Sequence, residues 1–175
     1  MALLKARLTV ISRMGNKIPA SVLSGLSFEH ITDEHCQEVH VVWRKHPSLA
    51  DARITLVWQR EMNKRRRKID VSILVHGRLC GLMLARLSRR RINVTLRYLE
   101  GNPNPWRNRL KGNIMEIALI VLESFAQAYG ATQISITQPD MALIPRYRQF
   151  GYRLTVRDAD RERRKLPIRG DRLVR

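Results

Sequence analysis

The fold of this chain is decided by a stretch that begins Arg109-Leu110-Lys111-Gly112-Asn113-Ile114. From Ile114 onward, apolar residues recur at helical spacing until the pattern stops at Gly130. This spacing predicts a helix over 113–129 that ends in a left-handed glycine. Gly112 lets an anion approach the backbone closely, and the first amides of a helix point outward without internal partners. Residues 109–114 are therefore a candidate phosphate-binding turn.

Strands are predicted on both sides of this helix. Alternating apolar residues predict strands at 69–75, 78–87 and 92–99, which short turns join into an antiparallel meander. A further strand, a short helix and a last strand are predicted at 133–137, 141–149 and 151–156.

Upstream of the meander the pattern predicts two helices. Thr32 precedes two acidic residues and predicts a helix start, and a second helix is expected from Ser48 through Ile54 to Met62. Residues 6–10 alternate as a short first strand would.

The spacing along 109–152 resembles the GNAT superfamily of N-acetyltransferases. That family has an Arg/Gln-x-x-Gly-x-Gly/Ala turn at the start of its main helix, and Arg109 and Gly112 match the first two fixed positions. The family's helix ends in a glycine about eighteen residues later, as Gly130 does here. Ile114 stands where the family has a small residue.

The resemblance continues beyond the helix. Asp140 stands where the family has an Asn, and Tyr147 precedes Gly151-Tyr152 at the spacing of the family's Tyr and Gly-Phe. The match implies an α+β, GNAT-like fold: a mixed, mostly antiparallel central sheet, flanked by helices, with a splay between strands four and five. Here these two strands are 92–99 and 133–137.

The same resemblance implies an acyl-CoA co-substrate, most simply acetyl-CoA, with its pantetheine arm in the splay. The residues expected to bind it are Arg109, Leu110, Lys111, Gly112, Asn113, Ile114 and Asp140. Tyr147 matches the family's general acid; the alternative is a tyrosine packed in the core. Glu100 ends a strand beside the loop and is the candidate base; the alternative is an ion pair with a neighbouring arginine. His76 and Glu34 are weaker candidates for the base.

Charge points to a polyanionic partner. Lys and Arg number 33 against 15 Asp and Glu, which leaves a net charge of +18. Such a field attracts polyanions: nucleic acid, an anionic membrane or phosphate-rich small molecules. A solubilising surface is the alternative. An antiparallel meander brings the basic run at 64–68 and the turn at 89–91 to one end of the sheet. The candidate nucleic-acid-binding residues are Lys64, Arg65, Arg66, Arg67, Lys68, Arg89, Arg90 and Arg91.

Two further features belong to this charge pattern. Arg161, Arg163, Arg164 and Lys165 could close over the basic cluster. Trp106, in the loop at 101–112, either stacks a base or covers the edge of the core.

We expect a single domain over 1–156 and a basic C-terminal tail over 157–175 that is mobile or ordered by a partner. Cys36 and Cys80 lie in apolar segments and are expected to be buried free thiols, which favours a reducing cytoplasm. No apolar run is long enough to span a membrane, and the N-terminal residues do not predict a signal peptide. No metal site is expected, since His35 and His40 lie on diverging helix faces.

Three functions are compatible with these features. The first is an acyl-CoA-dependent N-acyltransferase whose amine acceptor is linked to or associated with nucleic acid, such as tRNA, DNA or a ribosomal protein. The second is an acetyltransferase of a small amine, which the positive charge disfavours. The third is a GNAT-fold module that binds nucleic acid without catalysis, which Ile114 and Asp140 favour. A homodimer is compatible with all three.

Overall fold

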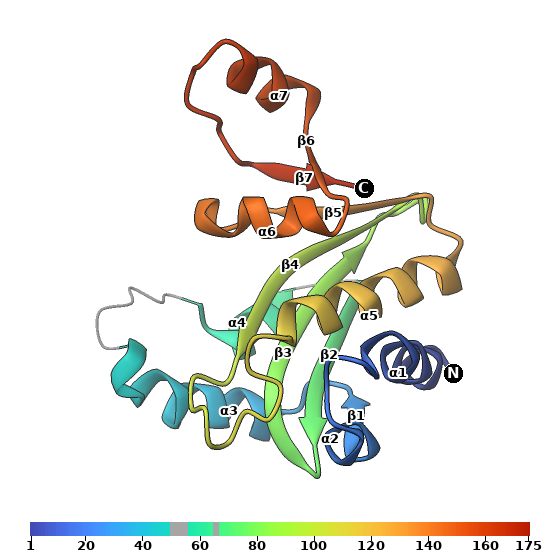
Figure 1. Cartoon of the computed structure of the whole chain (residues 1–175), viewed down its shortest axis with the longest axis vertical. Coiled ribbons are helices and arrows are strands. Elements are labelled where there is room, and N and C mark those ends of the chain that lie inside the picture. Colours follow the sequence, from blue (N-terminus) through green and yellow to red (C-terminus); the bar gives the residue numbers. More distant parts are fainter. Residues whose placement is uncertain (50–55, 65–66) are drawn as a thin grey trace.

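A central sheet with helices on both faces organises the chain (Figure 1). The computed structural model describes residues 1–49, 56–64 and 67–175. Within these residues, seven strands pair in the order β1-β2-β3-β4-β5-β7-β6. Their bounds are β1 Leu26–Glu29, β2 Lys68–Val75, β3 Arg78–Leu87, β4 Asn93–Gly101, β5 Gln133–Thr137, β6 Arg153–Leu154 and β7 Arg172–Val174. The pair β4–β5 is parallel and the other pairs are antiparallel.

The helices bury two separate apolar cores against this sheet. The helical elements are α1 Ala2–Met14, α2 Ala20–Ser24, α3 Asp33–Val41, η1 Trp43–Lys45, η2 Pro47–Leu49, α4 Trp58–Lys64, α5 Ile114–Tyr129, η3 Met141–Leu143, α6 Ile144–Gln149 and α7 Val156–Arg163. Residues of α1, α5 and α6 pack into the larger core, and residues of α3 and α4 pack into the smaller one on the other face. No helix in the described residues is long and apolar enough to cross a membrane.

Helix α5 and its C-terminal end confirm the local prediction. Gly130 adopts φ +66°, in the left-handed region, and its N–H donates to the carbonyls of Ala126 and Gln127. A side chain is strained in this conformation, so glycine ends the helix at little cost. The helix start at Thr32 is confirmed as well, since its hydroxyl accepts a hydrogen bond from the N–H of His35.

Strands β4 and β5 separate part of the way along their length, as the expected splay requires. They pair from Asn93 opposite Gln133 to Leu96 opposite Ile136. The Thr137 hydroxyl donates to the Leu96 carbonyl over 3.1 Å, and β5 ends there. β4 continues to Gly101, paired on its other side with β3. Figure 1 shows β4 running away from β5 toward the loop at 101–112.

Ile114 packs onto the sheet through two strand glycines. A Cβ at Gly81 would lie 3.2 Å from the Cδ1 and Cγ2 atoms of Ile114, and one at Gly101 would lie 3.5 Å from its Cγ1 atom. The large side chain at the start of α5 therefore fills space that the glycines of β3 and β4 leave open. It points toward the sheet rather than into the turn before the helix.

Residues 6–10 do not form a strand. They belong to α1, whose Ala6, Val10 and Met14 are fully buried in the core shared with α5. The apolar positions recur every four residues here, and this helical period outweighs the short alternation. The helix expected from Ser48 is also different: η2 covers Pro47–Leu49 and α4 begins at Trp58. Ile54 lies outside the described residues.

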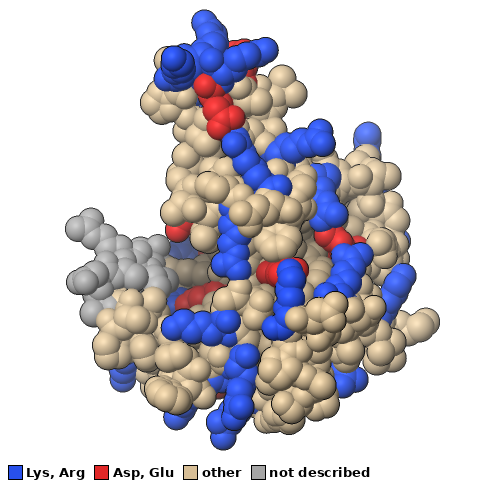
Figure 2. Space-filling model, viewed as in Figure 1, with Lys and Arg blue, Asp and Glu red and all other residues tan. Residues whose placement is uncertain are grey.

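The expectation of a mobile C-terminal tail is wrong. Residues 157–175 contribute to α7 and form β7, which inserts between β5 and β6. Leu173 is fully buried in the core, and the Asp158 carboxylate accepts hydrogen bonds from the N–H groups of Arg169 and Gly170 over 2.9 and 3.1 Å. Figure 2 shows Lys and Arg side chains gathered on the projecting part that Figure 1 identifies as α7 and the residues after it.

Candidate functional site

The turn before α5 presents N–H groups that have no protein acceptor. Among the described residues, no hydrogen bond engages the N–H of Gly112, Ile114, Met115 or Glu116. Gly112 adopts φ +87°, and apart from its two chain neighbours no atom of the described residues lies within 4 Å of where its Cβ would be. The space above the turn is therefore open, and the free N–H groups and the helix dipole there favour an anion.

Of the remaining residues of this turn, one is buried in the core and two are exposed at the surface. Leu110 is buried and anchors the turn in the core, and its N–H donates to the Asn108 Oδ1 atom over 3.0 Å. Arg109 and Lys111 are exposed, while Asn113 is half-buried at the helix start. Two exposed cations thus lie beside the free N–H groups.

Helix α6 is joined directly to this turn. The Arg146 guanidinium donates a hydrogen bond to the Gly112 carbonyl. At the other end of this short region, the Asp140 carboxylate accepts a hydrogen bond from the Ala142 N–H over 2.9 Å and so caps η3. Asp140 is exposed and adds a negative charge next to α6.

Tyr147 lies in α6, one residue from the Arg146 contact. Its ring is buried and meets the Tyr152 ring edge to face, with 6.2 Å between ring centroids. No hydrogen bond among the described residues engages its hydroxyl. Burial raises the pKa of the Tyr147 phenol above its ordinary value of 10.0; Asp140 adds to the shift and Arg146 opposes it. The phenol therefore keeps its proton throughout the neutral range.

Glu100 is held by donors from two distant segments. Both guanidinium nitrogens of Arg44 bond its carboxylate, one of them over 2.8 Å, and the Trp58 indole N–H donates to it over 2.7 Å. All three side chains are largely buried. The ion pair that the sequence left as an alternative is thus present, although Arg44 lies 56 positions away in the chain.

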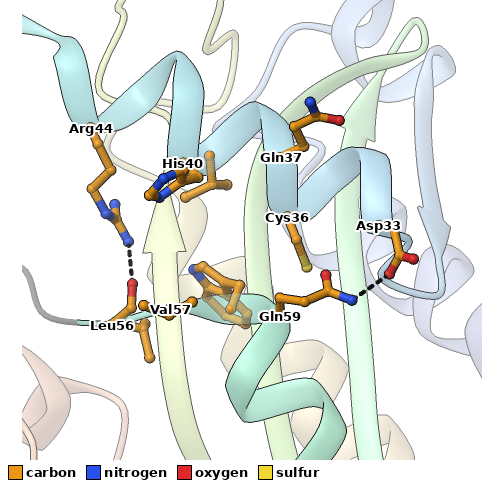
Figure 3. Close-up of a pocket in the computed structure, with 10 residues that line it drawn as sticks. Asp33, Cys36, Gln37, His40, Arg44, Leu56, Val57 and Gln59 are labelled. Carbon is orange, nitrogen blue, oxygen red and sulfur yellow. Dashed lines mark hydrogen bonds between the residues drawn. The ribbon is translucent and has the colours of Figure 1, made fainter.

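A hollow of about 250 Å³ lies between α3 and the start of α4, next to this cluster (Figure 3). Arg44 and Trp58 line it together with Cys36 and His40. The Arg44 Nη2 atom, which bonds Glu100 over 2.8 Å, also donates to the Leu56 carbonyl over 3.3 Å. The Gln59 side-chain amide donates to the Asp33 carboxylate across the opening of the hollow (Figure 3).

The basic cluster forms at one end of the sheet, as the meander predicted. The Arg67 guanidinium donates to the Arg89 carbonyl over 2.8 Å. A hollow of about 380 Å³ is lined there by Arg67, Lys68, Arg89, Arg91 and the exposed ring of Tyr129.

The other cations of this group are placed differently. Arg90 lines a neighbouring hollow, and Lys64 pairs with Glu61. Arg65 and Arg66 lie outside the described residues.

The tail cations do not close over this cluster. Arg163 and Arg164 pair with Asp160 within α7, and the Arg161 guanidinium donates to the Pro167 carbonyl over 2.7 Å. These local contacts hold them on the projecting part of the molecule.

The two cysteines and His35 take part in packing and hydrogen bonding within the fold. Cys36 and Cys80 are buried free thiols, as predicted, and burial raises the pKa of each above 9.0. The His35 ring bonds the Thr32 N–H and the Ser72 hydroxyl. No three His, Cys, Asp or Glu residues in the described part of the chain group as metal ligands.

Sequence reasoning missed Arg44, Trp58 and Arg146. None of the three lies in a recognisable motif, and the two arginines are among many in this chain. Their roles follow from contacts across 34 to 56 positions in the chain. No local pattern carries such contacts.

Known proteins share this arrangement at the level of the fold. No family model and no curated protein match the sequence. The ribosomal-protein-S18-alanine N-acetyltransferase from Escherichia coli matches with a TM-score of 0.52 and 12% identity, over 85% of this chain and 90% of that one. The PaiA N-acetyltransferase from Thermoplasma acidophilum, solved with coenzyme A, matches with a TM-score of 0.53 and 12% identity, over 85% of this chain and 96% of that one. The N-acetylglutamate synthase from Neisseria gonorrhoeae, solved with coenzyme A and N-acetyl-glutamate, matches with a TM-score of 0.59 and 15% identity, over 86% of this chain and 34% of that one.

Proposed function

Because the chain has the fold of the GNAT N-acetyltransferases, we propose that it is an acyl-CoA-dependent N-acyltransferase that uses acetyl-CoA. The observation that carries this proposal is the open turn before α5, with its free N–H groups, next to the splay of β4 and β5. Gly112, Ile114, Met115 and Glu116 would bind the pyrophosphate of the donor through these groups, with Arg109 and Lys111 beside them.

The free edge of β4 suits the pantetheine arm. After Leu96 the strand pairs with no described residue on the β5 side, and residues 97–101 are half-buried. An extended amide chain can add to such an edge through backbone hydrogen bonds. The arm would run from the turn into the splay, and Ile114 does not obstruct it because its side chain packs against Gly81 and Gly101.

Tyr147 is proposed as the general acid. When the carbon–sulfur bond breaks and the new carbon–nitrogen bond forms, its hydroxyl would donate a proton to the leaving sulfur. A phenol with a raised pKa keeps that proton available at neutral pH. The amine proton would pass to water, since an α-amino group has an ordinary pKa of about 8 and is partly neutral. Glu100, engaged by three donors, would position Arg44 and Trp58 rather than remove the proton.

The acceptor is proposed to be an amine linked to or associated with nucleic acid. The hollow lined by Arg67, Lys68, Arg89 and Arg91 gathers four cations around one aromatic ring, Tyr129. Phosphates attract such cations, and a base can stack on the ring. One of the structural neighbours acts on an alanine of a ribosomal protein, which is an acceptor of this kind. A small cationic amine would be repelled by the net charge of +18.

Calorimetric titration with acetyl-CoA tests the donor half of the proposal. We expect binding that Gly112→Val weakens about 10-fold to 100-fold, because the side chain would strain the turn and block hydrogen bonds to a charged group. Gly130→Val is the matched control: it imposes the same backbone strain at the other end of α5 and should leave the affinity unchanged. No binding at millimolar acetyl-CoA would leave only the non-catalytic alternative.

Salt dependence tests the acceptor half. The affinity for RNA or DNA should fall steeply between 50 and 200 mM salt, and the double variant Arg89→Gln/Arg91→Gln should flatten the log–log slope by about 2. Arg153→Gln removes an exposed arginine elsewhere and should change the slope less. Absent or salt-insensitive binding would contradict a nucleic-acid acceptor while leaving the donor result intact.

A further inference from the structure

Trp106 is exposed in a molecule that buries its other two tryptophans. Its relative exposure is 88%, against 1% for Trp43 and 2% for Trp58. It therefore does not cover the edge of the core, which was one of its two expected roles. Its backbone N–H takes part in the fold of the loop, but any residue other than proline would supply that group. The large apolar ring thus contributes little to folding.

The loop that carries Trp106 is held rigidly by asparagine side chains. Asn102 donates to the Leu79 carbonyl over 3.0 Å, and its side-chain oxygen accepts from the Asn104 N–H over 3.0 Å. The Asn104 oxygen accepts from the Trp106 N–H over 2.9 Å, and Asn108 donates to the Asn102 carbonyl over 2.8 Å. The backbone under the ring is therefore ordered before any ligand binds, which lowers the entropy cost of binding.

Arg107, the residue that follows Trp106 in the loop, belongs to a basic groove. Arg107 and Arg78 line a hollow of about 500 Å³ between the loop, the β2–β3 turn and α3, and Figure 1 shows the loop next to α3. Both arginines are exposed, and neither takes part in an ion pair among the described residues. Val42 supplies an apolar wall, and the Glu38 carboxylate in the groove accepts a hydrogen bond from Trp43. The volume is in the range of small-molecule sites, about 300–1,000 Å³.

We propose that Trp106 and this groove bind an unpaired nucleotide of a nucleic acid, with the base stacked on the indole and the phosphate bound by Arg78 and Arg107. The proposal rests on the proposed nucleic-acid acceptor and adds a second contact to it. An exposed aromatic ring, followed directly in the loop by one of the two arginines of the groove, suits a nucleobase joined to a phosphate. In a duplex the faces of the bases are covered by their neighbours, so the site selects single-stranded segments.

The site and the basic hollow lie at opposite ends of the same strands. Arg78 begins β3 and the loop follows the end of β4, whereas the hollow lies at the turn between β3 and β4. The β4 strand between them has nine residues and spans about 26–30 Å at ~3.3 Å per residue. A strand of nucleic acid bound at both ends would therefore pass along the sheet that carries the splay.

Intrinsic fluorescence tests this proposal, because Trp106 is the one exposed emitter among the three tryptophans, all of which lie in the described residues. A single-stranded RNA 12-mer should quench the red edge of the emission and protect it from iodide, and the matching duplex should do so much less. Trp106→Ala should weaken binding of the 12-mer about 5-fold to 100-fold, while Trp106→Phe, which retains a ring, should weaken it less. Arg107→Gln should weaken binding more than the control Arg153→Gln.

The outcomes separate this inference from the proposed function. Equal affinity of Trp106→Ala and the parent protein for the 12-mer would overturn the inference, even if acetyl-CoA binds. Quenching by coenzyme A with none by the 12-mer would overturn it as well, because the ring would then belong to the donor site. Quenching by the 12-mer in a protein that does not bind acetyl-CoA would support the inference and contradict the acyltransferase proposal.

Discussion

At the scale of single residues, Glu100 shows how strongly surroundings decide a role. Its position at the end of a strand beside the loop made it the candidate base, but its carboxylate accepts from Arg44 and Trp58 at once. Three donors thus occupy its two oxygens, which leaves an incoming amine little access to them. We therefore expect Glu100 to position Arg44 and Trp58, which line the hollow between α3 and α4.

A double-mutant cycle on this pair distinguishes the two roles of Glu100. Glu100→Gln and Arg44→Met should each lower the free energy of unfolding by about 1–3 kcal/mol, because each leaves a largely buried charge without its partner. The double variant should be more stable than the sum of the single losses predicts. Urea denaturation measures this. Additive losses in the free energy of unfolding, together with a Glu100→Gln variant that folds normally but has no turnover at any pH, would support Glu100 as the catalytic base.

Tyr147 leads to a prediction on pH dependence. Its pKa is raised above 10.0, so the acid stays protonated and its ionisation should produce no fall in turnover between pH 6 and 9. Tyr147→Phe should lower kcat about 100-fold at pH 7. The deficit should shrink toward pH 9, because a thiol with an ordinary pKa of about 8.5 then leaves as a thiolate without help. The affinity for acetyl-CoA should stay nearly constant, and an unchanged rate at pH 7 would remove Tyr147 from the acid role.

At the scale of elements, the junction of α5 with the sheet explains the departure at Ile114. The family has a small residue at this position, whereas here the small residues are Gly81 and Gly101 on the strands. Close approach of a helix to a sheet needs space on one side only, so an exchange of large and small residues preserves the packing. This leaves the turn before the helix open.

Substitutions at this junction test the exchange. Gly81→Ala should lower the stability by about 1–3 kcal/mol, because the new methyl group would meet two Ile114 atoms and a backbone oxygen at 3.2–3.3 Å. Adding Ile114→Val removes one of those atoms and should recover part of the loss. Gly101→Ala, with its nearest contact at 3.5 Å, is the milder control. Thermal denaturation of the parent, the two single variants at Gly81 and Ile114, their double variant and Gly101→Ala gives the comparison. Strictly additive effects of the Gly81 and Ile114 changes would contradict the exchange.

At the scale of the whole molecule, the last strand joins the tail to the core. β7 pairs with β5 through Ser135, Ile136 and Thr137, and with β6 through Arg153 and Leu154. The carbonyl and N–H of Arg175 also bond Ile134. The tail therefore completes the far half of the sheet, whereas the cations of α7 lie on the projecting part of the molecule.

Truncations in the tail measure this coupling. Leu173→Ala should lower the free energy of unfolding by about 2–5 kcal/mol, since the side chain is fully buried. Val156→Ala removes an apolar group that is 89% exposed in the same segment and should change the stability little. Hydrogen exchange at Ile136 should also accelerate in the first variant alone. Equal stability of the two variants would mean that β7 does not hold the sheet in solution.

Much of the local structure could be read from neighbouring residues. The period of α5, the glycine that ends it, the capping threonine of α3 and the alternation of β2 to β4 are consequences of backbone geometry over a few residues. The meander also brought Arg67 and Arg89 together, because hairpins determine which strand ends meet. The candidate turn at 109–114 followed from the same local rules.

The remaining features depend on contacts between distant parts of the chain. The Arg44–Glu100 pair spans 56 positions, and β7 enters the sheet between two strands that precede it. The α1 segment shows both a short alternation and a four-residue period, and the packing of Ala6, Val10 and Met14 against α5 uses the helical one. Such contacts form only where burial and complementary charge outweigh the entropy of closing a long loop, and no short pattern encodes that balance. Sequence therefore located the turn, and the folded chain alone showed that it is open, that Glu100 is engaged and that Trp106 is exposed.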